Sequence, residues 1–279
     1  MIPADREEAQ GIRDPAEIVR ADRVEVAFGP RTIWRDATFR IRRGEFVAVI
    51  GPNGAGKTTL FRLLLGLLRP SGGRLEVFGA SPRRGNPRIG YVPQSHAVDR
   101  DTNVEAGQLV RLGYAANRWY PNLTPAMFRA ERIAAETALR SVAAEEIATK
   151  PLGAMSGGEL QRIFLAEALA GNPEILLLDE PLASLDVRRA REFVELVHSL
   201  VQSRGVTPLL VAHDINPLIH CLDKVVYVAN GRVATGTPAD VLTTEKLSAL
   251  YGVRVEVLRD SRGRIVIVGG EDSHPDPNA

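Results

Sequence analysis

The stretch that decides the fold is Gly51-Pro-Asn-Gly-Ala-Gly-Lys57-Thr58, which fits the pattern G-x-x-x-x-G-K-[ST]. It follows the apolar run Phe46 to Ile50 and precedes a helical run that we predict over Thr59 to Leu68. Glycines let a backbone wrap around phosphate oxygens, and the helix presents the positive end of its dipole to the anion. An ordinary glycine-rich turn is the alternative, but the order of strand, loop and helix favours phosphate binding. The predicted binding residues are Gly51, Pro52, Asn53, Gly54, Ala55, Gly56, Lys57, Thr58 and Thr59.

Two further apolar runs, Ile175 to Leu178 and Leu209 to Ala212, are typical of strands that are covered on both faces in a parallel sheet. Between them lies Val187 to Arg204, whose apolar residues recur at helical spacing and supply the crossover that parallel strands require. The core is therefore predicted to be α/β, with a parallel sheet of the P-loop NTPase type.

The flanking segments differ in character from this core. Between Val19 and Ile41, apolar and polar residues alternate in part, which predicts short antiparallel strands joined near Gly29-Pro30. The same pattern predicts a strand over Arg74 to Phe78. Residues 101–170 lose the strand-like runs and contain Ala-rich helical segments, which predicts an inserted helical subdomain. Residues 253–258 and 264–268 are β-rich and predict a terminal hairpin.

Ile175-Leu-Leu-Leu-Asp179-Glu180 is an apolar strand that ends in two carboxylates. On a parallel sheet the carboxyl end of a strand is where a ligand binds. Asp179 is expected to hold the Mg²⁺ shell, and Glu180 to orient and polarise the water that attacks the γ-phosphate. An acidic strand end that simply exits to solvent is the alternative, but the phosphate loop upstream favours the catalytic interpretation.

Charge and hydropathy exclude some classes of function. Of the 279 residues, 35 are basic and 34 acidic, so the net charge of +1 gives no broad footprint for nucleic acid or an anionic membrane. No apolar stretch approaches the roughly 20 residues needed to span a bilayer, and Met1 to Gln10 lacks the apolar core of a signal peptide. We therefore expect a cytoplasmic protein that reaches a membrane only through a partner.

Met155-Ser-Gly-Gly-Glu-Leu-Gln161-Arg162 resembles the signature motif of the ATP-binding subunits of ABC transporters, and the resemblance covers nearly everything from Val19 to about Val268. It implies that Ser156, Gly157 and Gly158 bind the γ-phosphate of an ATP held by a second copy, in a head-to-tail dimer bridged by ATP. Met155 stands where leucine is usual and Glu159 where glutamine is common. Without the other motifs, a Ser-Gly-Gly helix cap would explain the segment.

The same resemblance assigns four further residues. Gln94 in Gly90-Tyr-Val-Pro-Gln is expected to approach Mg²⁺ and the attacking water, and Asp186 to link the two ATP sites. His213 is expected to hydrogen-bond the γ-phosphate. Phe28 lies near the position of an adenine-stacking aromatic, although a core phenylalanine is the alternative.

The resemblance implies an ATPase subunit of an importer that uses ATP and Mg²⁺ and docks on an integral membrane permease at the inner face of the cell membrane, with an extracytoplasmic solute-binding protein as an indirect partner. The segments after His213 and Gly236 and around Tyr251 resemble most closely those of zinc or manganese importers. Importers of ferric siderophores or cobalamin are the first alternative. An exporter subunit and a soluble ABC ATPase that acts on ribosomes or DNA are the remaining alternatives. We expect an ABC ATPase domain at residues 18–268 with a helical subdomain at about 95–170, and loose tails at 1–17 and 269–279.

Overall fold

The computed structural model describes residues 14, 16–94, 98, 99, 101–115, 124–183, 185–261 and 263–269. Nearly all of the two expected tails lies outside these residues, and Glu17 is the first residue of a strand. Among the described residues, no helix is long and apolar enough to cross a membrane.

A six-stranded sheet forms the centre of the molecule, in the order β5-β6-β7-β3-β8-β9. Its first five strands run parallel, and β9 pairs antiparallel with β8. Successive residues of β3 alternate between two hydrophobic clusters, because Val47 and Val49 face one side of the sheet while Ala48 and Ile50 face the other. This explains the unbroken apolar runs of the sequence and confirms the predicted α/β core. The strands are β3 (Val47–Ile50), β5 (Ile89–Val92), β6 (Ile175–Asp179), β7 (Thr207–Val211), β8 (Lys224–Ala229) and β9 (Arg232–Gly236).

One face of this sheet is covered by α1 (Lys57–Leu64) and by an antiparallel sheet of order β2-β1-β4, with β1 at Glu17–Phe28, β2 at Arg31–Arg42 and β4 at Gly72–Val77. The strands β1 and β2 are longer than the short strands that we predicted. Register shifts interrupt their pairing, and Arg23 and Asp36 have positive φ, so the apolar alternation is broken although the strands continue.

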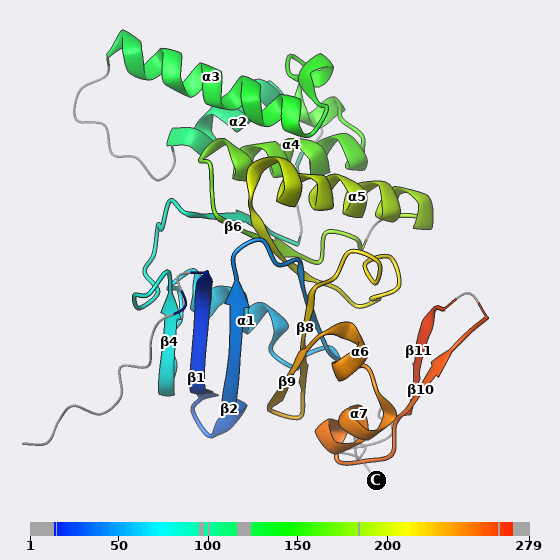
Figure 1. The fold of residues 1–279 in the computed structure, drawn as a ribbon. Coiled ribbons are helices and arrows are strands. Elements are labelled where there is room, and N and C mark those ends of the chain that lie inside the picture. Colours follow the sequence, from blue (N-terminus) through cyan, green and yellow to red (C-terminus); the bar gives the residue numbers. More distant parts are fainter. Residues whose placement is uncertain are drawn as a thin grey trace, which may run out of the picture.

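The other face is covered by helices that Figure 1 shows gathered together. The predicted crossover helix is confirmed over its full length as α5, and the described residues of the predicted inserted segment form three α-helices. These four helices are α2 (Ala106–Ala115), α3 (Pro125–Ser141), α4 (Gly157–Ala170) and α5 (Val187–Arg204). Two 3-10 turns, Glu145–Ile147 and Leu152–Ala154, connect α3 to α4.

The C-terminal part begins with the short helices α6 (Pro238–Val241) and α7 (Thr244–Tyr251). It ends in the predicted hairpin, formed by β10 (Glu256–Arg259) and β11 (Ile265–Val268). Figure 1 shows this hairpin, in red, projecting from the body of the molecule.

One further prediction about local structure was wrong, and three strands were not predicted. The helix after the phosphate loop ends at Leu64 rather than Leu68, because Gly66 takes φ +67° and a Cβ there would lie 2.5 Å from the backbone of Arg83. The strands β5, β8 and β9 were not predicted, and β5 is an edge strand of only four residues that contains Gly90.

Candidate nucleotide-binding and hydrolysis site

The phosphate loop joins the carboxyl end of β3 to α1, and its glycines are required by geometry. Gly51 and Gly56 have φ of +149° and +100°, and Gly54 has φ +74°. A Cβ at Gly51 would lie 1.9 Å from the carbonyl oxygen of Val228, and one at Gly56 would lie 2.7 Å from Trp34 Nε1. Only glycine fits at positions 51 and 56, whereas at position 54 a Cβ would meet nothing and only the positive φ favours glycine.

Lys57 begins α1 and is only 5% exposed. Its Nζ donates hydrogen bonds to the carbonyl oxygens of Gly51 at 2.9 Å and Pro52 at 3.0 Å. Burial lowers the pKa of Lys57, while the carboxylates of Glu180 and Asp179 act in the opposite direction. The Lys57 ammonium group therefore contacts the backbone of the phosphate loop and lies near the carboxylates of Glu180 and Asp179.

Asp179 is the last residue of β6 and is buried. Its Oδ1 lies 3.5 Å from the Thr58 hydroxyl, and Tyr91 donates to its Oδ2 over 3.4 Å. Burial is the main cause of a raised Asp179 pKa, and the Glu180 carboxylate adds to it. Burial likewise raises the pKa of Tyr91. Tyr91 was not among the predicted site residues, although it lies within Gly90-Tyr-Val-Pro-Gln, because the strand that carries it was not predicted.

Glu180 follows β6 directly and has a backbone φ of +50°, which is uncommon for a residue with a side chain. Its Oε2 accepts a hydrogen bond from Gln94 Nε2 at 2.5 Å, and its Oε1 lies 2.8 Å from His213 Nε2. Gln94 and His213 come just after β5 and β7, the two strands that flank β6. The structure thus brings three predicted residues together at one edge of the sheet.

Ser156 caps α4, with its hydroxyl accepting from the backbone N–H of Glu159 at 3.4 Å. The Glu159 carboxylate in return accepts from Ser156 N at 2.7 Å and from Lys150 Nζ at 2.9 Å. The contact with the Ser156 backbone and the Lys150 ammonium hold the pKa of Glu159 at about 2. A Cβ at Gly157 or Gly158 would meet nothing within 4 Å, so this loop is open to solvent. Within the described chain it makes no hydrogen bond to the phosphate loop.

Asp186 caps α5, and its Oδ1 accepts from the backbone N–H of Arg189 at 2.9 Å. Its side chain is 61% exposed and makes no described contact with Glu180 or the phosphate loop. Its Oδ2 also lies 3.5 Å from Arg189 Nε, so both contacts that the structure describes for this carboxylate are with Arg189.

Phe28 is the last residue of β1, and its side chain is 47% exposed, so the core interpretation of this phenylalanine is wrong. Its hairpin also contacts the phosphate loop, because the buried Trp34 of β2 donates from Nε1 to the Ala55 carbonyl at 3.4 Å. Phe28 and the loop are therefore held by the same hairpin.

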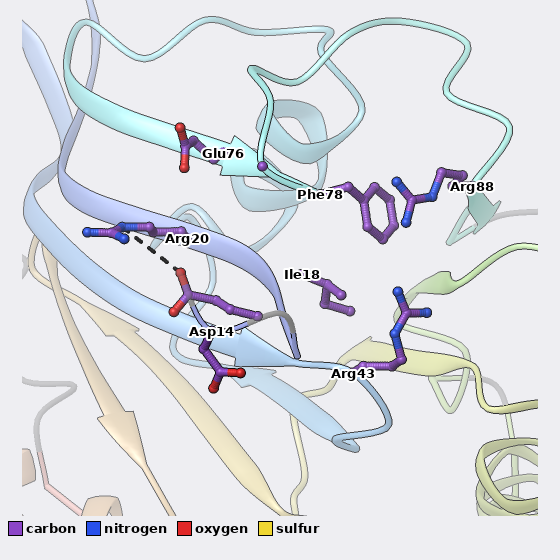
Figure 2. A pocket seen from close by; sticks show the side chains of 9 residues that line it. Asp14, Ile18, Arg20, Arg43, Glu76, Phe78 and Arg88 are labelled. Atoms are coloured by element: carbon purple, nitrogen blue, oxygen red, sulfur yellow. Dashed lines mark ion pairs between the residues drawn. The ribbon is translucent and has the colours of Figure 1, made fainter. Parts of the chain in front are cut away.

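A separate cavity of about 220 Å³ lies where β1 begins and β4 ends, and residues that precede β3 and β5 also line it. Figure 2 shows Arg20, Arg43 and Arg88 around it, and the Arg88 guanidinium lies 3.5 Å from the Phe78 ring centroid. Arg43 and Arg88 both pair with Glu174, and Arg20 pairs with Asp22. Each of these arginines thus has an acidic partner, and the cavity lies near the amino ends of β3 and β5, whereas the candidate site lies at the carboxyl ends of the central strands.

A phosphate loop at the carboxyl edge of a parallel sheet, with paired acids on a nearby strand, defines the class of P-loop nucleotide-binding proteins. Comparison with known proteins makes the assignment specific: the sequence profile of the ABC transporter family matches residues 34–183. The chain therefore belongs to the ABC transporter family, as an ATP-binding protein of its ATPase class.

Individual relatives match most of the chain. The zinc import ATP-binding protein ZnuC of Halorhodospira halophila is 35% identical over 87% of this chain and 85% of its own length. The manganese transport system ATP-binding protein MntB of Bacillus subtilis is 33% identical over 87% of this chain and 95% of its own length. Among solved structures, an inward-facing putative metal-chelate type ABC transporter has a TM-score of 0.75 at 24% identity, covering 91% of this chain and 98% of its own, which shows the fold alone.

Proposed function

We propose that this chain is the ATP-hydrolysing subunit of an importer that drives uptake of zinc or manganese through a separate membrane permease. The observation that carries the proposal is the similarity to ZnuC and MntB, which are named for zinc import and manganese transport and are matched over most of their lengths. A subunit that hydrolyses ATP for such a permease would act at the inner face of the cell membrane. We further propose residues 18–268 as the ABC ATPase domain, with a helical subdomain at about 95–170.

The geometry of the candidate site supports separate roles for its residues in ATP hydrolysis. In our proposal the loop amides and Lys57 bind the phosphates of ATP, and Lys57 exchanges its two carbonyl contacts for phosphate oxygens. Glu180 orients and polarises the attacking water, while Gln94 and His213 hold its carboxylate in place. Phe28 offers an exposed ring for the adenine.

The oxygen ligands near the loop fit a magnesium ion. Thr58 Oγ1 and Asp179 Oδ1 lie 3.5 Å apart, and hydroxyl and carboxylate oxygens are the donors that Mg²⁺ prefers. We propose that Thr58, Asp179 and Gln94 hold the ion. When bound, Mg²⁺ neutralises negative charge on the phosphates.

The exposure of Ser156, Gly157 and Gly158 supports an ATP site that is formed by two copies of the chain. Ser156, Gly157 and Gly158 leave the amino end of α4 exposed and do not contact the phosphate loop of the same chain. We propose that they contact the γ-phosphate of ATP bound to a second copy in a head-to-tail dimer, and that the exposed Asp186 meets that copy. A permease, and indirectly a solute-binding protein outside the cell, complete the assembly.

Elemental analysis of cells tests the substrate. Cells that lack the chain should accumulate less zinc or manganese, and their growth under chelation should be rescued by the metal or by the wild-type gene but not by a Glu180→Gln gene. Unchanged zinc and manganese, together with reduced uptake of ferric siderophore or cobalamin, would overturn the metal-ion proposal. Purified chain tests the enzyme separately, because ATP hydrolysis should stop when a chelator removes Mg²⁺.

A further inference from the structure

Asn216 joins the segment that carries His213 to the C-terminal hairpin. Its Oδ1 accepts from the backbone N–H of Ile265 at 2.7 Å, and its Nδ2 donates to the carbonyl of the same residue at 3.0 Å. The side-chain amide thus satisfies both backbone groups of Ile265, as a neighbouring strand would. Ile265 begins β11 and is 4% exposed, so water does not readily replace this partner.

The same amide stiffens the segment after His213. Asp214 Oδ1 accepts from the backbone N–H of Asn216 at 2.9 Å and from Asn216 Nδ2 at 2.7 Å, which closes an Asx turn. Within the described chain, neither His213 nor Asp214 takes part in a backbone–backbone hydrogen bond. Backbone hydrogen bonds hold the residues on either side, from Ala212 N–H to the Val49 carbonyl at 3.1 Å and from Leu218 N–H to the Ile215 carbonyl at 2.8 Å. Among the described residues, the hydrogen bonds that link this segment to β11 all involve the Asn216 side chain.

Of the residues in β10 and β11, Ile265 is the one that is buried. Ile265 shares a hydrophobic cluster with the buried Ile215, the residue that precedes Asn216. A second tie reaches α7, because Ser248 Oγ donates to the Val255 carbonyl and accepts from its N–H, both at 3.0 Å. Val255 directly precedes β10, and within β10 the Val257 N–H donates to Thr244 Oγ1 of α7 at 3.0 Å. The hairpin region is thus attached to the His213 segment through Asn216 and to α7 through Ser248 and Thr244.

We infer that Asn216 is a positioning residue for ATP hydrolysis: by fastening its segment to the hairpin, it holds His213 against the Glu180 carboxylate. The inference rests on the proposed roles of His213 and Glu180. The His213 side chain is 45% exposed, so the 2.8 Å contact with Glu180 depends on where the backbone is held rather than on tight packing of the ring. The C-terminal hairpin, far from the phosphate loop in sequence, thereby becomes part of the support of the hydrolysis site.

The matched pair Asn216→Ala and Ser248→Ala tests this, since the first removes two hydrogen bonds to β11 and the second removes two hydrogen bonds to Val255, the residue before β10. In the full-length chain Asn216→Ala should lower kcat for ATP at least about tenfold and change KM less than about twofold, because it misplaces a group needed after ATP has bound. Ser248→Ala should leave kcat within about twofold of the parental value. The NMR signal of the His213 ring, assigned by its loss in His213→Ala, should shift in Asn216→Ala and not in Ser248→Ala.

A double-mutant cycle separates positioning from general destabilisation. If Asn216 acts through His213, adding Asn216→Ala to His213→Ala should lower kcat no further. Asn216→Asp is the second variant if Asn216→Ala does not fold; it keeps an acceptor for the Ile265 N–H, loses the donor, and should give an intermediate kcat. Three outcomes would each overturn the role of Asn216 while leaving the proposed site intact. They are a parental kcat in the folded Asn216 variants, an equal loss of kcat in Asn216→Ala and Ser248→Ala, or a double mutant whose loss of kcat is the product of the two single losses. A parental chain without ATPase activity, or His213→Ala at parental kcat, would overturn the proposed site and this inference with it.

Discussion

Glu180→Gln isolates the catalytic carboxylate without changing the size of the side chain. In the structure both carboxylate oxygens are engaged, with Oε2 accepting from Gln94 and Oε1 facing His213 Nε2 at 2.8 Å. A glutamine has only one oxygen for these partners. If its oxygen keeps the contact with Gln94, its NH₂ faces His213, which must then present a lone pair instead of an N–H.

The expected loss follows from what the substitution removes. A positioned general base contributes about 10²- to 10⁴-fold to rate, which corresponds to about 2.7 to 5.4 kcal/mol of activation free energy. Binding of ATP should persist, since the side chain of Glu180 makes no hydrogen bond to Lys57 or the glycine loop within the described chain. The variant should therefore bind ATP and accumulate in the ATP-bridged dimer.

Two measurements check this: phosphate release under saturating ATP, and light scattering with and without ATP. The matched control is Glu245→Gln, at an exposed position in the first turn of α7, which should hydrolyse ATP at the parental rate. Hydrolysis by Glu180→Gln at the parental rate would refute the assignment of the catalytic carboxylate. An unchanged mass with ATP at high protein concentration would instead count against the head-to-tail dimer.

Two further variants test the loop and the cap of α4. Gly56→Ala should weaken binding of a labelled ATP analogue by at least about tenfold, because the new Cβ would lie 2.7 Å from Trp34 Nε1. The backbone φ of +100° alone costs a residue with a side chain about 1–2 kcal/mol. Unchanged affinity would show that the loop is not fixed by this contact. Glu159→Ala should lower the free energy of unfolding at neutral pH by about 1 kcal/mol, since it removes half of a capping box and the contact with Lys150. Because folding lowers the Glu159 pKa from 4.5 to about 2, this stabilisation is complete above pH 4.5 and is lost as the pH falls toward 2. The urea midpoints of the parental chain and of Glu159→Ala should therefore converge as the pH is lowered. A difference between the two midpoints that stays constant with pH would contradict the assignment.

Much of the fold could be predicted because a few residue patterns have few physical solutions. Apolar runs such as Ile175 to Leu178 must be covered on both faces, and the glycines at 51 and 56 occupy positions where a Cβ collides with Val228 or Trp34. Strand order is a different matter, since nothing local to Ile89–Val92 shows that it pairs with β6. That pairing is what brings Gln94 to Glu180, 86 residues away in sequence.

The backbone of Glu180 shows why the rest of the site could not be predicted. A non-glycine residue at φ +50° costs about 1–2 kcal/mol, and no sequence pattern marks it. Its neighbours can hold the conformation: Ala183 N–H donates to the Glu180 carbonyl at 3.2 Å, and Gln161 of α4 donates to the carbonyl of Pro181. The first contact is a local turn, but the contact with Gln161 joins segments that are adjacent only after folding, as do those of the carboxylate with Gln94 and His213. The orientation of the carboxylate is therefore a property of the assembled sheet, α4 and the His213 segment. Substitutions distant in sequence, at Gln161 or Asn216, are therefore expected to act on hydrolysis without touching ATP.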